Sequence, residues 1–310
     1  MNAPYLLRLA SLSLASFFVM NMVCGAILEC ASGFAIRFVS GMRACAAARF
    51  LFALRIAPAA VPVFAIAALC IPSYVWLEPD AVSERIGLFC AAAAISGAAL
   101  WTFSIARSVR AVAESRRYLR SCFERGERRQ LAGGAALIVS SNRTTVLAGL
   151  LSPVVVVSRD VAEALTAEQL DVAVLHERSH AVSRDNLKRL AILLAPGLFS
   201  LNRLEQAWKR LAEWAADDVA VSGDRSRSLA LAEALVRVAR MGPGPQPSAL
   251  TTSLLGDDFT ARIDRLLNSE PGARSFRWQP VAAVLAAFAI VLLRPSTLAA
   301  VHQALERLMH

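Results

Sequence analysis

Three uncharged, apolar stretches constrain the fold of this 310-residue chain more than any other feature. They are residues 9–28, 56–77 and 86–106, and each is long enough to cross a bilayer as a single helix. With 56% hydrophobic and only 18% charged residues, the chain also has too little polar surface for an ordinary soluble protein. The sequence therefore predicts a mainly α-helical membrane protein with a membrane domain over residues 1–106.

A fourth transmembrane helix is expected around residues 280–301, in a segment, 279–310, that ends in a short tail. The uninterrupted apolar part of this segment, Val281 to Leu293, is short, and Arg294 and Pro295 interrupt it. A tilted helix with Arg294 reaching the interface would still cross, and a buried or re-entrant segment is the alternative. We therefore expect three to four transmembrane helices.

The arginines predict the orientation of these helices. Four arginines lie between the first two spans, at positions 37, 43, 49 and 55, and many more follow the third span directly. Because positively charged loops stay in the cytoplasm, we expect the N-terminus outside and residues 107–278 inside a bacterial cytoplasmic membrane. A cleaved signal peptide over residues 1–30 is the alternative, but its removal would leave the arginine-rich loop outside.

The net charge of +9 fits this topology. The basic stretch after the third span lacks interleaved aromatic residues and adjoins the membrane, so we expect contact with the lipid bilayer and no direct nucleic-acid binding.

The sequence from His176 to His180 reads HERSH, an HExxH pattern inside a segment with helical periodicity. Four positions apart on a helix, His176 and His180 can offer both imidazoles to one metal ion. Glu177 then points toward the attacking water, as a base and not as a ligand. Thr166 and Gln169 have the spacing of a capping box, which predicts where the helix begins. Two solvated histidines on a surface helix are the alternative.

A catalytic zinc ion needs a third protein ligand and an open position. The metzincin pattern would place its third ligand at position 186, where this chain has Asn186. The next predicted helix, expected to begin with Asn202 as its cap, carries Glu213 and Asp217 on one face. This segment resembles the second ligand helix of gluzincin peptidases, in which case Glu213 would bind zinc and Asp217 would accept the second ring N–H of a ligand histidine. A pair of solvated acids is the alternative.

Short β-rich runs precede these helices, at residues 136–140, 144–148 and 154–158. They predict a small sheet. An extended substrate can bind an edge strand by main-chain hydrogen bonds, and the segment considered for this role is Thr145, Val146, Leu147, Ala148 and Gly149.

The layout of the spans, the AGLLSPVVV run from Ala148, the HERSH and SRDN motifs and the EWAAD segment from Glu213 resemble BlaR/MecR-type membrane metallopeptidases, the antirepressor family of gluzincins. HtpX-like membrane proteases are more distantly similar. The resemblance implies a cytoplasmic α+β gluzincin zinc-peptidase domain over residues 107–278, with one Zn²⁺ per chain. Its substrate would be a cytoplasmic protein, such as a transcriptional repressor, or the chain itself.

Two further expectations come from the same comparison. Arg262 resembles an arginine common after the second ligand helix of membrane gluzincins and could stabilise transition-state charge, with a structural ion pair as the favoured alternative. Because only about ten residues follow the last span, we do not expect the extracellular penicillin-binding sensor domain of this family.

Other functions remain open at this stage. The nearest is a membrane quality-control protease of the HtpX kind. A non-catalytic signal transducer with a zinc-stiffened domain is a different class, although a structural zinc site is normally closed by four protein ligands. A transporter is less favoured, because the three clear spans contain no ionisable acid or base.

Overall fold

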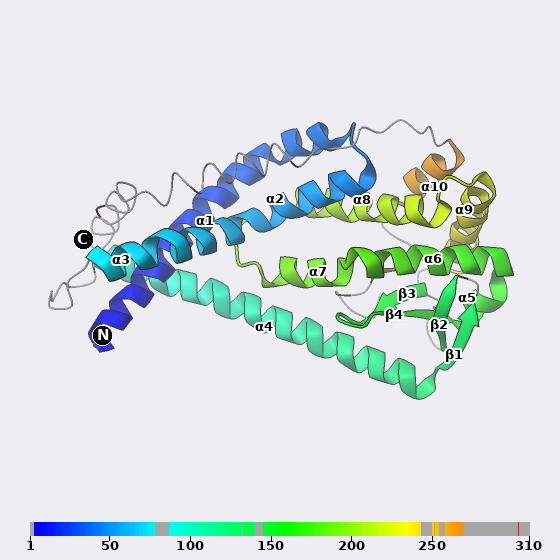
Figure 1. Cartoon of the computed structure of the whole chain (residues 1–310), viewed down its shortest axis with the longest axis horizontal. Coiled ribbons are helices and arrows are strands. Elements are labelled where there is room, and N and C mark those ends of the chain that lie inside the picture. Colours follow the sequence, from blue (N-terminus) through cyan, green and yellow to red (C-terminus); the bar gives the residue numbers. More distant parts are fainter. Residues whose placement is uncertain are drawn as a thin grey trace.

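The computed structural model describes residues 3–77, 87–131, 133–139, 145–242, 250, 252–253, 258–268 and 303. Three long helical rods dominate it (Figure 1). They are α1 (Ala3–Val39), α2 (Ala44–Ala65) continued by the π-helical turn η1 (Ile66–Cys70) and α3 (Ile71–Leu77), and α4 (Leu88–Arg125). Each rod is long and apolar enough to cross a membrane, which confirms the three predicted spans by length and composition. The predicted fourth span lies outside the described residues.

The rods are longer than the spans predicted from the sequence. The first apolar helix covers 35 residues, which is about 50 Å of helix against a hydrocarbon core of about 30 Å. The segment between the first two spans is also helical: Arg37 lies in the last turn of α1, and Arg49 and Arg55 lie in α2. The expectation of an arginine-rich loop was therefore wrong, and only a short turn joins α1 to α2.

A buried amide joins α1 to the proline-containing α2. Pro62 has no N–H, so the carbonyl oxygen of Pro58 loses its partner within the helix. The side chain of Asn21, which is buried in α1, donates to that oxygen at 2.8 Å. It also donates to the carbonyl oxygen of Pro196 at 2.9 Å. One side chain thus joins α1 and α2 to a segment that lies far away in the sequence.

A five-stranded mixed sheet follows α4, in the order β1-β2-β4-β3-β5. Its strands are β1 (Glu127–Leu131), β2 (Gly134–Val139), β3 (Thr145–Ala148), β4 (Val154–Ser158) and β5 (Thr252–Ser253). Strands β2 and β4 are parallel, and the other pairs are antiparallel. The three β-rich runs predicted from the sequence are confirmed as β2, β3 and β4.

Helices cover both faces of this sheet. Alternate residues of β2 point to opposite sides, as the strand period of two requires: Ala136 and Ile138 join the core formed with α6 (Ala167–Ser183) and α9 (Arg225–Arg240). Leu137 and Val139 pack with Cys122 of α4 in a second core. In Figure 1 the sheet accordingly lies between the end of α4 and α6. The remaining helices are α5 (Arg159–Ala164), α7 (Asp185–Leu194), α8 (Asn202–Val221) and α10 (Phe259–Leu267).

Helix α8 packs directly against α1 and α2. Leu51 of α2 shares a buried cluster with Leu204 and Trp208 of α8, and Figure 1 shows α8 beside α2. Arg55 lies 3.6 Å from Glu205 in an ion pair across the same interface.

The start of α8 differs from the prediction. Leu201, in the left-handed region at φ 47°, is the N-cap, and no side chain caps this end of the helix. Asn202 is the first helical residue, because tertiary packing of Leu201 into the α2–α8 interface determines the turn.

Candidate metal centre

Helix α6 places two histidines side by side. The helix begins with the predicted capping box, in which the Thr166 side chain accepts from the Gln169 backbone and the Gln169 side chain accepts from the Thr166 backbone. His176 and His180 follow one turn apart, and their Nε2 atoms are 3.3 Å from each other. Both side chains are buried, so the alternative of two solvated histidines is wrong.

Helix α8 brings a carboxylate to the same point. Glu213 places Oε2 3.4 Å from Nε2 of His176 and Oε1 3.6 Å from Nε2 of His180. Ligands about 2.0–2.2 Å from a tetrahedral metal ion lie roughly 3.3–3.6 Å apart, so these three residues match three corners of such a shell. The cluster of His176, His180 and Glu213 can therefore hold a metal ion, as predicted.

Each histidine has a carboxylate behind it. Nδ1 of His176 lies 2.9 Å from Oδ1 of Asp217, the residue predicted for this role. Nδ1 of His180 lies 2.7 Å from Oδ2 of Asp185. A carboxylate at Nδ1 fixes the tautomer that leaves Nε2 free to bind a metal ion, and it increases the basicity of the ring. Both Nε2 atoms consequently face Glu213.

Asp185 is a site residue that the sequence pattern does not reveal. Its carboxylate contacts both His180 and Lys188, whose Nζ lies 2.7 Å from Oδ1. The backbone explains the contact. Arg184 adopts the left-handed conformation at φ 55°, which ends α6 and starts α7 at once. This left-handed conformation is uncommon for residues other than glycine, and it directs Asp185 back toward the last turn of α6. The HExxH motif, read as part of one straight helix, does not reveal this contact.

The site attracts positive charge. Burial would lower the pKa of His180, but the charge of Glu213 and the hydrogen bond with Asp185 outweigh it and raise that pKa to about 10. Burial also opposes ionisation of Glu213, whose pKa is nevertheless held well below its usual value by His180 and His176. Protons on the histidines thus supply the positive charge that a bound cation would otherwise provide.

Glu177 lies in the same buried region, with 0% of its surface exposed. Burial raises the pKa of its carboxyl to about 7, although the two neighbouring histidines act in the opposite direction. A base with a pKa near the working pH is suited to taking up and returning a proton.

Arg262 of α10 completes the buried network. Its Nε and Nη2 atoms donate to the two carboxylate oxygens of Asp217, at 2.9 and 2.6 Å. Nη1 lies 3.2 Å from Oε2 of Glu213. This bidentate contact is the structural ion pair that the sequence analysis favoured. It restrains the carboxylates of Asp217 and Glu213.

The segment considered as a substrate edge strand, Thr145 to Gly149, needs a correction. Strand β3 pairs with β4 on one side, and β5 occupies its other side opposite Val146 and Leu147. The strand is therefore internal at those two residues. The pairing comes from residues 252–253, more than 100 positions away, which no local pattern predicts.

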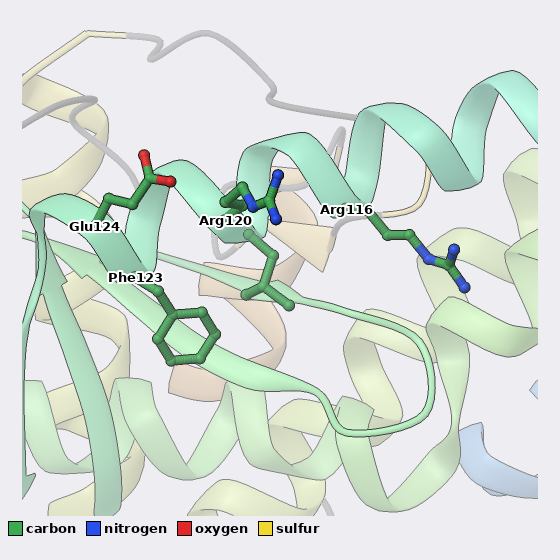
Figure 2. A pocket seen from close by; sticks show the side chains of 5 residues that line it. Arg116, Arg120, Phe123 and Glu124 are labelled. Atoms are coloured by element: carbon green, nitrogen blue, oxygen red, sulfur yellow. The ribbon is translucent and has the colours of Figure 1, made fainter.

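A cavity of about 260 Å³ reaches His180 from the side of β3 and α7. A second, larger hollow of about 520 Å³ lies on α4, and successive turns of that one helix supply Arg116, Arg120, Phe123 and Glu124 around it (Figure 2). None of the residues that line this second hollow belongs to the metal cluster.

Comparisons with known proteins leave the site to be interpreted from its own geometry. No family model matches this chain, and no curated protein matches it significantly.

Proposed function

We propose that this chain is a membrane-embedded zinc endopeptidase that hydrolyses peptide bonds of a cytoplasmic protein. The observation that carries the proposal is the cluster of His176, His180 and Glu213. The Nε2 atoms of the two histidines lie 3.3 Å apart, and each lies 3.4–3.6 Å from a carboxylate oxygen of Glu213. Glu177 is buried next to this cluster. Two imidazoles and one carboxylate are a donor set typical of catalytic zinc, which keeps its fourth position open.

The chemistry of the reaction divides between the ion and the side chains. Zinc, when bound, polarises the substrate carbonyl and lowers the pKa of water. The Glu177 carboxylate removes a proton from the attacking water and returns it to the nitrogen of the leaving amine, so that a water molecule is consumed and two chain ends are formed. Asp217 and Asp185 keep the two imidazoles in the required tautomer, and Arg262 holds Asp217 and Glu213 in place.

Membrane attachment is part of the proposal. The arginine distribution favours a cytoplasmic site in a bacterial cytoplasmic membrane, with the N-terminus outside. The contact of α8 with α1 and α2 supports a signalling role, because the helix that carries Glu213 also packs on helices that cross the bilayer. Membership of the BlaR/MecR-type antirepressor family, with a transcriptional repressor or the chain itself as substrate, is our preferred assignment.

The test uses the purified full-length chain in nanodiscs, loaded with zinc and incubated with a complex mixture of denatured cytoplasmic proteins. We expect new peptide termini with the wild type, and none with Glu177→Gln at equal zinc content. His176→Ala should bind far less zinc. Equal zinc content in His176→Ala would refute the metal centre. Zinc-loaded wild type that produces no more termini than Glu177→Gln would instead favour the non-catalytic transducer. A broad range of cleaved proteins would support quality control over signalling.

A further inference from the structure

The cavity beside His180 has an apolar wall. Leu147 of β3, Leu187 of α7, and Leu150, Leu151 and Pro153 of the loop between β3 and β4 line it. The side chain of Leu151 is 87% exposed. The cavity thus combines this apolar wall with the polar side chains of Arg184 and Asn186, and its inner end is His180, a proposed zinc ligand.

The volume of the hollow limits what it can hold. About 260 Å³ is available, and a cavity of roughly 150 Å³ is enough for a benzene molecule. A leucine, methionine or phenylalanine side chain therefore fits, and burying it against these walls is favourable.

The walls of the hollow are held in place by Asn186, at the start of α7. Its Nδ2 donates to the carbonyl oxygens of Leu147 and Gly149, at 3.2 and 2.8 Å. Gly149 has φ 98°, a region that glycine adopts without the strain that a side chain causes, and the β3–β4 loop turns there. The hollow is consequently fixed between two elements before any ligand arrives.

An exposed arginine, Arg184, lies beside the hollow. Its side chain makes no hydrogen bond or ion pair within the part of the chain that the structure describes, whereas the neighbouring Lys188 is paired with Asp185. The backbone of Arg184 is left-handed at φ 55°, a costly conformation for a residue with a side chain. Charge complementarity predicts an acidic group on whatever binds here.

We propose that this hollow is the specificity pocket of the proposed peptidase, and that it selects an extended substrate segment with a leucine-, methionine- or phenylalanine-sized side chain next to the scissile bond and an acidic side chain beside that residue. The apolar side chain fills the hollow against His180, and the acidic one pairs with Arg184. The inference rests on the proposed function, because only a reaction at the metal centre gives the pocket a substrate to select.

The first experiment measures binding without turnover. Zinc-loaded, full-length Glu177→Gln protein in nanodiscs is titrated with fluorescent peptides that differ only at two adjacent positions, leucine or alanine at one and aspartate or lysine at the other. We expect alanine to weaken binding by about 10- to 100-fold. At low salt, lysine should weaken it by about two- to fivefold relative to aspartate, because the pair with Arg184 is exposed.

Two variants and a control locate the effect. In the same background, Arg184→Glu should reverse the preference so that lysine is favoured, while Arg159→Glu, the same charge change at an exposed residue of α5, should leave it unchanged. Leu151→Ser should weaken the preference for leucine over alanine. Because the Leu151 side chain is exposed, we expect this substitution to have little effect on the stability of the fold.

The outcomes separate the pocket from the peptidase. If wild-type protein cleaves the leucine and alanine peptides equally well, and Arg184→Glu does not alter the preference between aspartate and lysine, the pocket assignment is overturned and the proposed peptidase activity is supported. If the peptides bind with the expected preferences and zinc-loaded wild type leaves them intact, the pocket stands and the proposed function fails. Binding that no peptide change affects would mean that a lipid chain or a second copy of the protein covers the hollow, which also overturns the assignment.

Discussion

The carboxylate behind His180 offers the sharpest quantitative prediction. Asp185 is 3% exposed and contacts Nδ1 of His180 at 2.7 Å and Nζ of Lys188 at 2.7 Å. Asp185→Ala leaves a buried ring N–H without an acceptor and no longer fixes the tautomer that directs Nε2 toward the metal. Loss of such a partner typically lowers metal affinity by about 10- to 100-fold, which corresponds to about 1.4–2.7 kcal/mol. Lys188 is partly exposed, so water replaces its partner at little cost.

The affinity is measured by competition with a chromophoric zinc chelator, using full-length protein in detergent. Lys188→Met, which keeps the contact between Asp185 and His180, should retain wild-type affinity within about twofold. Glu163→Gln, the loss of an exposed carboxylate on α5, should have no effect. If Asp185→Ala remains helical and binds zinc as tightly as the wild type, the role given to this carboxylate is wrong.

Three other outcomes follow from the structure. Replacing Asn21 with leucine removes its bonds to Pro58 and Pro196 and leaves two buried carbonyls unpaired, so the protein should lose about 1–3 kcal/mol of stability, seen as a lower unfolding temperature in nanodiscs. Arg262→Met leaves buried carboxylates uncompensated and should cost about 3–5 kcal/mol in the metal-free protein, with partial recovery in Arg262→Lys. Because the pKa of His180 is raised to about 10 in the metal-free site, its protonation stabilises the fold most fully below its ordinary pKa, and this contribution is lost as the pH rises toward 10. Zinc displaces these protons, so zinc affinity should increase from pH 6 to pH 8 by up to about tenfold per pH unit for each proton released, and calorimetry in buffers of different ionisation enthalpy should detect the release.

Features that depend on neighbouring residues could be predicted from the sequence. The three apolar stretches identify the rods, because crossing a bilayer requires a run of apolar residues. Thr166 and Gln169 predict the start of α6, because a capping box is a local pattern. The pairing of Glu213 with the two histidines was also predicted, from the resemblance of the EWAAD segment to the second ligand helix of gluzincins.

Features that depend on distant residues could not. Strand β1 reads ERRQL, a charged sequence with little strand character, and exists because it pairs with β2. The N-cap of α8 is Leu201, and not Asn202 as predicted, because the Leu201 side chain is buried against α1 and α2. The contact of Asp185 with His180 depends on the left-handed backbone of Arg184. The side of β3 away from β4 is occupied by β5, a strand more than 100 residues further along the chain. In each case tertiary contact determined the local structure.

The central claim is that Glu177 performs proteolysis at a zinc site. The most direct test compares protein N-termini across the proteome of the native host that expresses either the wild-type chain or Glu177→Gln at matched levels, with zinc content measured in both. The account predicts a set of termini that appear with the wild type and disappear with Glu177→Gln, which would also identify the substrate. Identical N-termini in the two strains under several stress conditions, with zinc bound in both proteins, would contradict it.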